Sequence, residues 1–228
     1  MREPTVADVM NPHIATLAPE TPFKHVIGIM IARDQAALPV IDAAGRPVGV
    51  VAEADVLPKL EFHAGIVHPP PAGGSRARAR WHKAAALTAA DLMTTPTIMV
   101  TADTPLSTAV YALSARQIRQ VCVVDANELL IGMLARQDTL RPFLRPDDTI
   151  RAEVERELAT AIPHSSGVTV DVTNGIVTLG GARAPGSAVH HAISAAHHVP
   201  GVVAVRNKMG HDADDLLSAS APETEESP

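Results

Sequence analysis

The chain has 228 residues, a formal net charge of −6 and 46% apolar residues, of which few are aromatic. This length allows one large domain or two smaller ones, built around an aliphatic core. The 2% aromatic content argues against single-strand nucleic-acid binding, which relies on base stacking, and the net charge disfavours a general phosphate-backbone binder. We therefore expect no nucleic-acid partner.

The first residues and the cysteine content favour a soluble cytoplasmic protein. The opening "MREPTVADVM" lacks the apolar core of a signal peptide. Apolar runs stay well below the roughly 20 residues of a membrane-spanning helix. The single cysteine, Cys122, lies in the apolar run "QVCVVD", which predicts a buried, inert thiol.

The chain repeats itself after 83 residues, the separation of Asp55 and Asp138. At this shift and without a gap, "LPVID" at 38–42 matches "VCVVD" at 121–125. Each copy also has a glycine six residues before its aspartate. Such self-similarity indicates a duplicated structural unit, in which the two aspartates hold equivalent positions.

Both copies open with a short helical segment, residues 5–10 and 88–93, each capped by its first threonine. After a short extended segment, a longer helix starts at "TP", with Thr21 or Thr104 as the cap and the proline in the first helical position. The apolar stripe of this helix is Phe23, Val26, Ile27, Met30 and Ile31 in the first copy and Leu106, Ala109, Val110 and Leu113 in the second.

Two strands and a last helix complete each copy. The strands meet at a turn that is predicted to use Gly45 in the first copy and Asn127 in the second for a positive φ. The last helix begins near Glu53 or Arg136 and carries the repeated aspartate. Each copy therefore predicts the order β-α-β-β-α.

With these marks the chain resembles the CBS domain family, over roughly residues 4–60 and 87–144. The resemblance implies an α/β (α+β) fold, in which a first repeat (1–60) and a second repeat (87–144) pack as one Bateman module. We refer to them as repeat 1 and repeat 2. It further implies a homodimer with no required cofactor, and AMP, ADP, ATP, NAD or S-adenosylmethionine as a regulatory ligand.

The repeated aspartates are the leading candidates for ligand contact. A carboxylate at a helix N-terminus is stabilised by the helix dipole and can accept hydrogen bonds from both hydroxyls of a ribose. The resemblance therefore assigns ribose contact to Asp55 and Asp138. The alternative interpretation is that each aspartate only caps its helix.

Ligand-binding members of the family often carry Ser or Thr three residues before the aspartate, where this chain has Ala52 and Ala135. Both hydroxyls that could touch a phosphate are thus missing. Thr16 keeps a hydroxyl in the segment that usually lines the cleft. Arg119 and Arg136 offer positive charge near Asp138, where repeat 1 has Ala36 and Glu53, so we expect the better nucleotide site in repeat 2. Their alternative role is surface solvation.

Residues 61–86 form an insertion between the repeats. A proline run and a glycine pair are followed by a basic stretch around the only tryptophan, Trp81. We interpret it as a solvated linker that is helical after Ser75, with a contact to nucleic acid or an anionic membrane as the alternative.

Residues 147–210 predict a separate α-β-β-α-β unit. The first helix, with Asp148 as its cap, buries Ile150, Val154, Leu158 and Ile162. Asn174-Gly175 predicts a two-residue hairpin that pairs Val172 with Val177. The motifs "VTNGIVTLGG" and "VPGVVAVRNKM" resemble the BON domain family, which implies contact with a partner protein or an anionic phospholipid.

The second helix of this unit carries the pairs His190–His191 and His197–His198, which we interpret as surface residues because a metal site favours closer spacing. Residues 211–228 predict an acidic, disordered tail.

Two functions fit these patterns. One is a regulatory protein, of bacterial composition, whose CBS pair senses an adenosyl ligand. The other is a constitutive dimeric scaffold or a phospholipid- or partner-binding stress protein with no nucleotide bound. The sequence shows no phosphate loop or nucleophile elbow, and we do not expect an enzyme.

Overall fold

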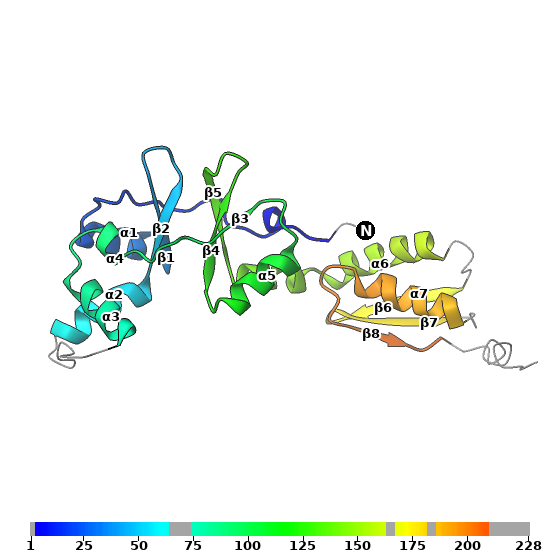
Figure 1. Cartoon of the computed structure of the whole chain (residues 1–228). Coiled ribbons are helices and arrows are strands. Elements are labelled where there is room, and N and C mark those ends of the chain that lie inside the picture. Colours follow the sequence, from blue (N-terminus) through cyan, green and yellow to red (C-terminus); the bar gives the residue numbers. More distant parts are fainter. Residues whose placement is uncertain (1–2, 64–73, 163–166, 182–185, 210–228) are drawn as a thin grey trace, which may run out of the picture. The chain divides into compact units, whose positions relative to one another are not determined.

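The computed structural model describes residues 3–63, 74–162, 167–181 and 186–209. Contacts divide the chain into two compact units, of which one is Pro4–Thr139 and the other starts at Leu140 (Figure 1). The proline and glycine run of the insertion and the acidic tail lie outside the described residues. No helix among the described residues is long and apolar enough to cross a membrane.

The first unit contains the duplicated elements, except that the last of them, η2, continues from Leu140 into the second unit. Repeat 1 consists of η1 (Val6–Asp8), α1 (Phe23–Arg33), β1 (Ala37–Ile41), β2 (Pro47–Ala52) and α2 (Glu53–His63), and α3 (Ser75–Ala85) lies in the insertion. Repeat 2 consists of α4 (Ala89–Leu92), β3 (Met99–Thr101), α5 (Leu106–Ala115), β4 (Gln120–Val124), β5 (Leu130–Ala135) and η2 (Asp138–Leu144). In each repeat the last two strands pair antiparallel, and an earlier segment adds to them in parallel.

The two repeats exchange their first helical segments. Val6 of η1 is fully buried in the core of repeat 2 with Leu106 and Leu134. Reciprocally, Leu92 of α4 is fully buried in the core of repeat 1 with Leu38. Figure 1 shows the dark-blue η1 beside β3 and the green α4 beside α1. Neither repeat therefore completes its core from its own residues.

Backbone hydrogen bonds stabilise this exchange, and two helices begin one residue later than predicted. The Val6 amide donates to the Thr104 carbonyl, and the Ala89 amide donates to the Thr21 carbonyl, both at 2.9 Å. These threonines are therefore engaged outside their own helices, and α1 and α5 begin one residue after the proline. The prediction of threonine caps with proline in the first helical position was wrong for this reason.

In each repeat the backbone at the repeated glycine, Gly49 or Gly132, lies too close to a neighbouring segment to leave room for a side chain. A Cβ on Gly132 would lie 2.9 Å from the backbone oxygen of Asn11, and one on Gly49 would lie 2.8 Å from Met93 Cγ. Met93 belongs to the exchanged segment of repeat 2, and Asn11 directly follows that of repeat 1. The glycines that mark the repeat in the sequence thus make room for the other repeat's chain.

Three local predictions needed correction. The second turn places Glu128, not Asn127, at positive φ, because Glu128 is the residue that matches Gly45 at the shift of 83. Ile31 is 77% exposed and Val110 is 37% exposed, so the core-facing stripes are narrower than predicted. The last helix of repeat 2 is a 3-10 segment that contains Pro142, which cannot donate an α-helical hydrogen bond.

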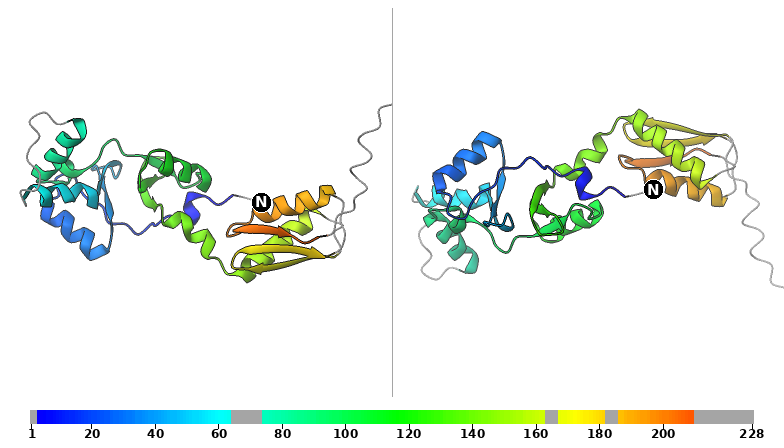
Figure 2. Two further views of the ribbon diagram at one scale, coloured as in Figure 1. Left: turned by 90° about the horizontal axis from the view of Figure 1, so that it is seen from below. Right: turned by 90° about the horizontal axis from the view of Figure 1, so that it is seen from above.

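The second unit has the order α-β-β-α-β, as predicted. It consists of α6 (Asp147–Ala161), β6 (Val168–Thr173), β7 (Ile176–Gly181), α7 (Gly186–His197) and β8 (Ala204–Asn207). β7 pairs antiparallel with β6 and parallel with β8. Both helices pack on one face of this sheet, around Ile150, Val154, Val177 and Leu179 (Figure 2). The predicted pair Val172–Val177 is confirmed.

Asp147 ties the predicted hairpin to the first helix. Its carboxylate accepts from the amides of Asn174 at 2.7 Å and Gly175 at 2.8 Å, and both of these residues have positive φ. Pro146 precedes the helix, and Asp148 pairs with Arg151 on the surface. The prediction of Asp148 as the cap was therefore wrong.

Candidate functional site

The repeated aspartates sit in the first turn after the last strand of each repeat. Asp138 accepts a hydrogen bond from the Ala135 amide at 2.9 Å, and Asp55 accepts one from the Ala52 amide at 2.8 Å. This is the acidic half of a capping box, in which a carboxylate reaches back to the amide three residues earlier. Asp138 is 5% exposed.

The same device occurs at the exchanged segments, where a threonine takes the place of the alanine. Asp8 accepts from the Thr5 amide at 2.8 Å, and Asp91 accepts from the Thr88 amide at 2.9 Å. Capping is thus a structural role that all four carboxylates share. The alanines at 52 and 135 leave the two candidate sites without the hydroxyl half of the box.

Two arginines lie beside Asp138 at the end of the repeat 2 sheet. The Arg136 amide donates to the Arg119 carbonyl at 3.0 Å, so the backbones of the two predicted residues are adjacent. The Arg136 guanidinium donates to the carbonyls of Ile118 and Leu113, at 2.8 and 3.0 Å. It therefore caps the C-terminal end of α5, where a cation is favoured. Arg119 is exposed.

Thr97 is a candidate that the sequence analysis missed. β3 pairs with β4 so that Met99 opposes Cys122, and Gln120 opposes Ala135 of β5. When the pairing of β3 with β4 is continued two residues before Met99, Thr97 lies beside Gln120. Thr97, Gln120 and Ala135 thus form one row across the sheet. Among the described residues, the Thr97 hydroxyl is a buried polar atom without a hydrogen-bond partner. Such an atom is costly unless a ligand or a water satisfies it.

The position equivalent to Thr97 in repeat 1 is Ile14, at the shift of 83 residues. The repeat could therefore have pointed to Thr97, because a hydroxyl side chain stands there in place of the apolar Ile14. Thr16 lies in the segment of repeat 1 that pairs with β1 and is exposed.

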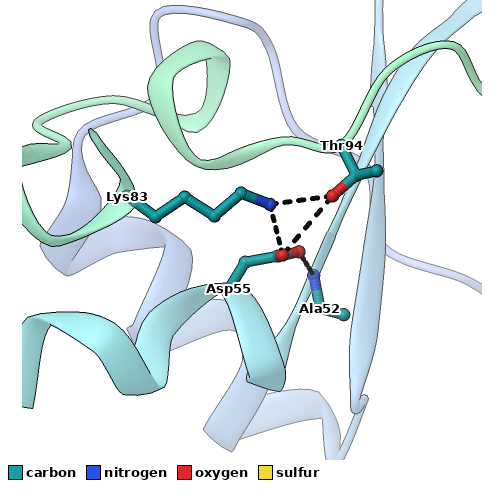
Figure 3. Close-up of polar contacts among 4 residues, drawn as sticks. All are labelled: Ala52, Asp55, Lys83 and Thr94. Atoms are coloured by element: carbon teal, nitrogen blue, oxygen red, sulfur yellow. Dashed lines mark hydrogen bonds and ion pairs between the residues drawn. The ribbon is translucent and has the colours of Figure 1, made fainter. Parts of the chain in front are cut away.

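In repeat 1 the carboxylate is engaged by a lysine from the insertion. Asp55 forms an ion pair with Lys83 of α3, and the Lys83 ammonium also donates to the Thr94 hydroxyl at 2.8 Å (Figure 3). The side chains of Lys83 and Asp55 are 20% and 13% exposed. The two repeats thus place different cations near equivalent aspartates.

Other reactive groups have structural surroundings. Burial raises the pKa of the Cys122 thiol to about 12, which agrees with the predicted inert role. His190, His191 and His197 of α7 and His198, which follows the helix, are exposed, as predicted. Within the described residues, no group of three or more His, Cys, Asp or Glu side chains could hold a metal ion.

Comparison with known protein families identifies the duplicated unit and the C-terminal unit. The CBS domain model matches residues 6–61 and 89–145, and the BON domain model matches residues 146–210. The chain carries tandem CBS domains followed by a BON domain. The predicted family and fold class are thereby confirmed. No curated protein matches the chain.

Two solved proteins that are similar to the CBS pair were determined with adenosyl ligands. The structure of CBSX2 in complex with AMP is 28% identical, with a TM-score of 0.53 over 61% of this chain and 96% of that one. CBSX2 is a CBS-pair protein from Arabidopsis thaliana. The CBS domain pair of MJ0100, in complex with 5′-methylthioadenosine and S-adenosyl-L-methionine, is 20% identical, with a TM-score of 0.50 over 62% and 97%. At that identity the second likeness shows the fold alone.

Proposed function

We propose that the protein is a non-catalytic regulator whose CBS pair binds an adenosyl ligand beside Asp138. One observation carries this proposal: the buried Thr97 hydroxyl has no hydrogen-bond partner in the part of the chain that the structure describes. Thr97 lies in the row of the sheet that ends at Ala135, and the Ala135 amide donates to Asp138. A ligand polar group at this row would satisfy that hydroxyl. The AMP bound to CBSX2 supports an adenosyl ligand.

Each predicted residue then has a separate task. Asp138 accepts hydrogen bonds from the ribose hydroxyls, and Arg119 provides the charge for a phosphate. Arg136 contributes less to the phosphate, because its guanidinium already caps α5. In repeat 1, Asp55 holds the position equivalent to Asp138, and Thr16 offers an exposed hydroxyl in the segment that pairs with β1.

A thermal-shift titration with AMP, ADP, ATP, NAD and S-adenosylmethionine tests the proposal. A ligand at 100 times its dissociation constant stabilises the fold by about 2.7 kcal/mol, which gives a clear rise in melting temperature. The rise should disappear in Asp138→Ala and shrink in Thr97→Val, which keeps the shape but removes the hydroxyl. Thr160→Val, on an exposed face of α6, is the matched control. The absence of a shift with all five compounds would contradict the proposal.

The exposed apolar residues support a homodimer through the CBS pair. Leu57 and Leu60 are 51% and 66% exposed, and their equivalents at the shift of 83, Leu140 and Phe143, are 59% and 55% exposed. Leu140 and Phe143 belong to the second compact unit, so the argument rests on Leu57 and Leu60 of α2, whose exposed side chains favour a surface that a second copy covers. Sedimentation velocity should give a dimer for the wild type and a monomer for Leu60→Asp. A wild-type monomer at tens of micromolar would refute this assembly.

The capping role of Asp55 and Asp138 favours a second function, a constitutive scaffold with no nucleotide, in which the BON domain binds a partner or an anionic lipid. The outer face of the BON sheet places Asp171, Thr178 and Arg206 in one row, which balances its charge. Flotation with anionic vesicles distinguishes binding of the BON domain to a lipid from binding to a partner protein. Protein that stays entirely in solution would exclude lipid binding.

A further inference from the structure

We propose that Lys83 closes the repeat 1 site by occupying the Asp55 carboxylate, so that one chain binds one adenosyl ligand, in repeat 2. This inference rests on the proposed function and extends it to the number of sites. Lys83 lies outside the duplicated unit, on the helix of the insertion, so the duplication itself does not supply a lysine to Asp138. The insertion thereby makes two equivalent aspartates unequal.

The contacts of Lys83 place its ammonium where a ligand hydroxyl would have to bind. One oxygen of Asp55 accepts from the Ala52 amide, and the other accepts from Lys83 and, at 3.4 Å, from the Thr94 hydroxyl (Figure 3). A ribose needs lone pairs on that second oxygen. An ammonium is a stronger donor to a carboxylate than a neutral hydroxyl is.

The helix that carries Lys83 is held in place independently of this ion pair. Trp81 packs edge-on against Phe62 of α2, with ring centroids 4.8 Å apart, and Arg80 pairs with Glu61 of α2. Because α3 is fixed against α2, the ammonium stays close to Asp55 at a high effective concentration. The partly buried pair is also screened less by salt than a surface pair. A ligand must displace Lys83 before it can use Asp55.

Isothermal titration with AMP, with S-adenosylmethionine as a second probe, measures the number of sites directly. We expect one site per chain in the wild type and two in Lys83→Met, which keeps the apolar stem but removes the charge. The double variant Lys83→Met/Asp138→Asn should keep one site, and adding Asp55→Asn should remove it. Lys83→Arg should retain one site, because the cation remains. Lys24→Met, on the exposed side of α1, is the matched control for loss of a lysine charge.

The outcomes separate this inference from the proposed function. One site in both the wild type and Lys83→Met would overturn the inference and leave the proposed function standing. A loss of affinity in Lys83→Met would make Lys83 a ligand contact, which also overturns it. No binding by either protein would refute the proposed function and this inference together. Trp81, the single tryptophan, gives a fluorescence signal that verifies that α3 remains docked in each variant.

Discussion

Repeat 1 and repeat 2 place the same aspartate in the same helical turn but surround it with different groups. In repeat 1 a lysine from the insertion reaches Asp55, and Ile14 stands in the row beside it. In repeat 2, Arg119 precedes β4 and Arg136 follows β5, so both arginines lie at the same end of the sheet. Thr97 has a buried hydroxyl in the row of residues at that end. Duplication therefore supplies the scaffold, while residues outside the shared motif give the two candidate sites different chemistry.

The largest expected effect concerns the glycines that admit the exchanged segments. We expect Gly132→Ala to lower the free energy of unfolding by about 2–3 kcal/mol, since the obstructing Asn11 oxygen belongs to the backbone. Gly49→Ala should cost somewhat less, about 1–2 kcal/mol, because Met93 Cγ and Sδ can move away, although Met93 Cβ, at 2.9 Å from the added carbon, cannot. Urea denaturation measures both.

A double-mutant comparison sharpens this difference between the repeats. Adding Met93→Ala should recover only the part of the Gly49→Ala loss that comes from Met93 Cγ and Sδ, because the Cβ remains, whereas adding Met10→Ala should recover little in Gly132→Ala. Equal coupling energies in the two repeats would show that the backbone oxygen of Asn11 is not the obstacle.

Arg136 and Arg119 should differ in their effect on stability without ligand. Arg136→Ala removes two charged hydrogen bonds to carbonyls at the end of α5, for an expected loss of about 1–2 kcal/mol. Arg119→Ala should change the free energy of unfolding by less than about 0.5 kcal/mol, since the side chain is exposed. Thermal denaturation of both variants decides the point, and a larger loss in Arg119→Ala would contradict the assignment.

Restoring the missing hydroxyls should give the two candidate sites the same capping arrangement that the exchanged segments have. Ala52→Thr and Ala135→Thr recreate the arrangement of Thr88 and Asp91, in which the hydroxyl also contacts the carboxylate at 2.9 Å. A completed cap stabilises a helix by about 0.5–1 kcal/mol. If the hydroxyl also contacts phosphate, Ala135→Thr should tighten AMP binding more than adenosine binding. Equal changes for both ligands would limit the effect to capping.

The repeat made most of the fold predictable, because one shift of 83 residues aligned α1, β1 and β2 of repeat 1 with α5, β4 and β5 of repeat 2. The exchange of η1 and α4 was not predictable, since an amphipathic turn has the same pattern whichever core buries it. The Glu128 turn could have been found by following the shift from Gly45. The role of Lys83 could not, because the insertion has no counterpart in the repeat and its contact with Asp55 depends on how α3 packs against α2.

The smallest expected effect concerns acid sensitivity at the exchanged segment of repeat 2. Hydrogen bonds from the Leu87 amide and from the hydroxyl and amide of Thr88 hold the pKa of Asp91 below its ordinary value. A carboxyl with a lowered folded pKa contributes stability above its unfolded pKa, near 4, and loses that contribution as the pH falls through the folded value. Asp91→Asn should therefore lower the free energy of unfolding at pH 7 but leave it nearly unchanged at pH 2. Because Asp91 is exposed, we expect a loss below about 1 kcal/mol, which denaturation curves at the two pH values can resolve. A loss of equal size at both pH values would mean that the shape of the side chain, and not its charge, stabilises the segment.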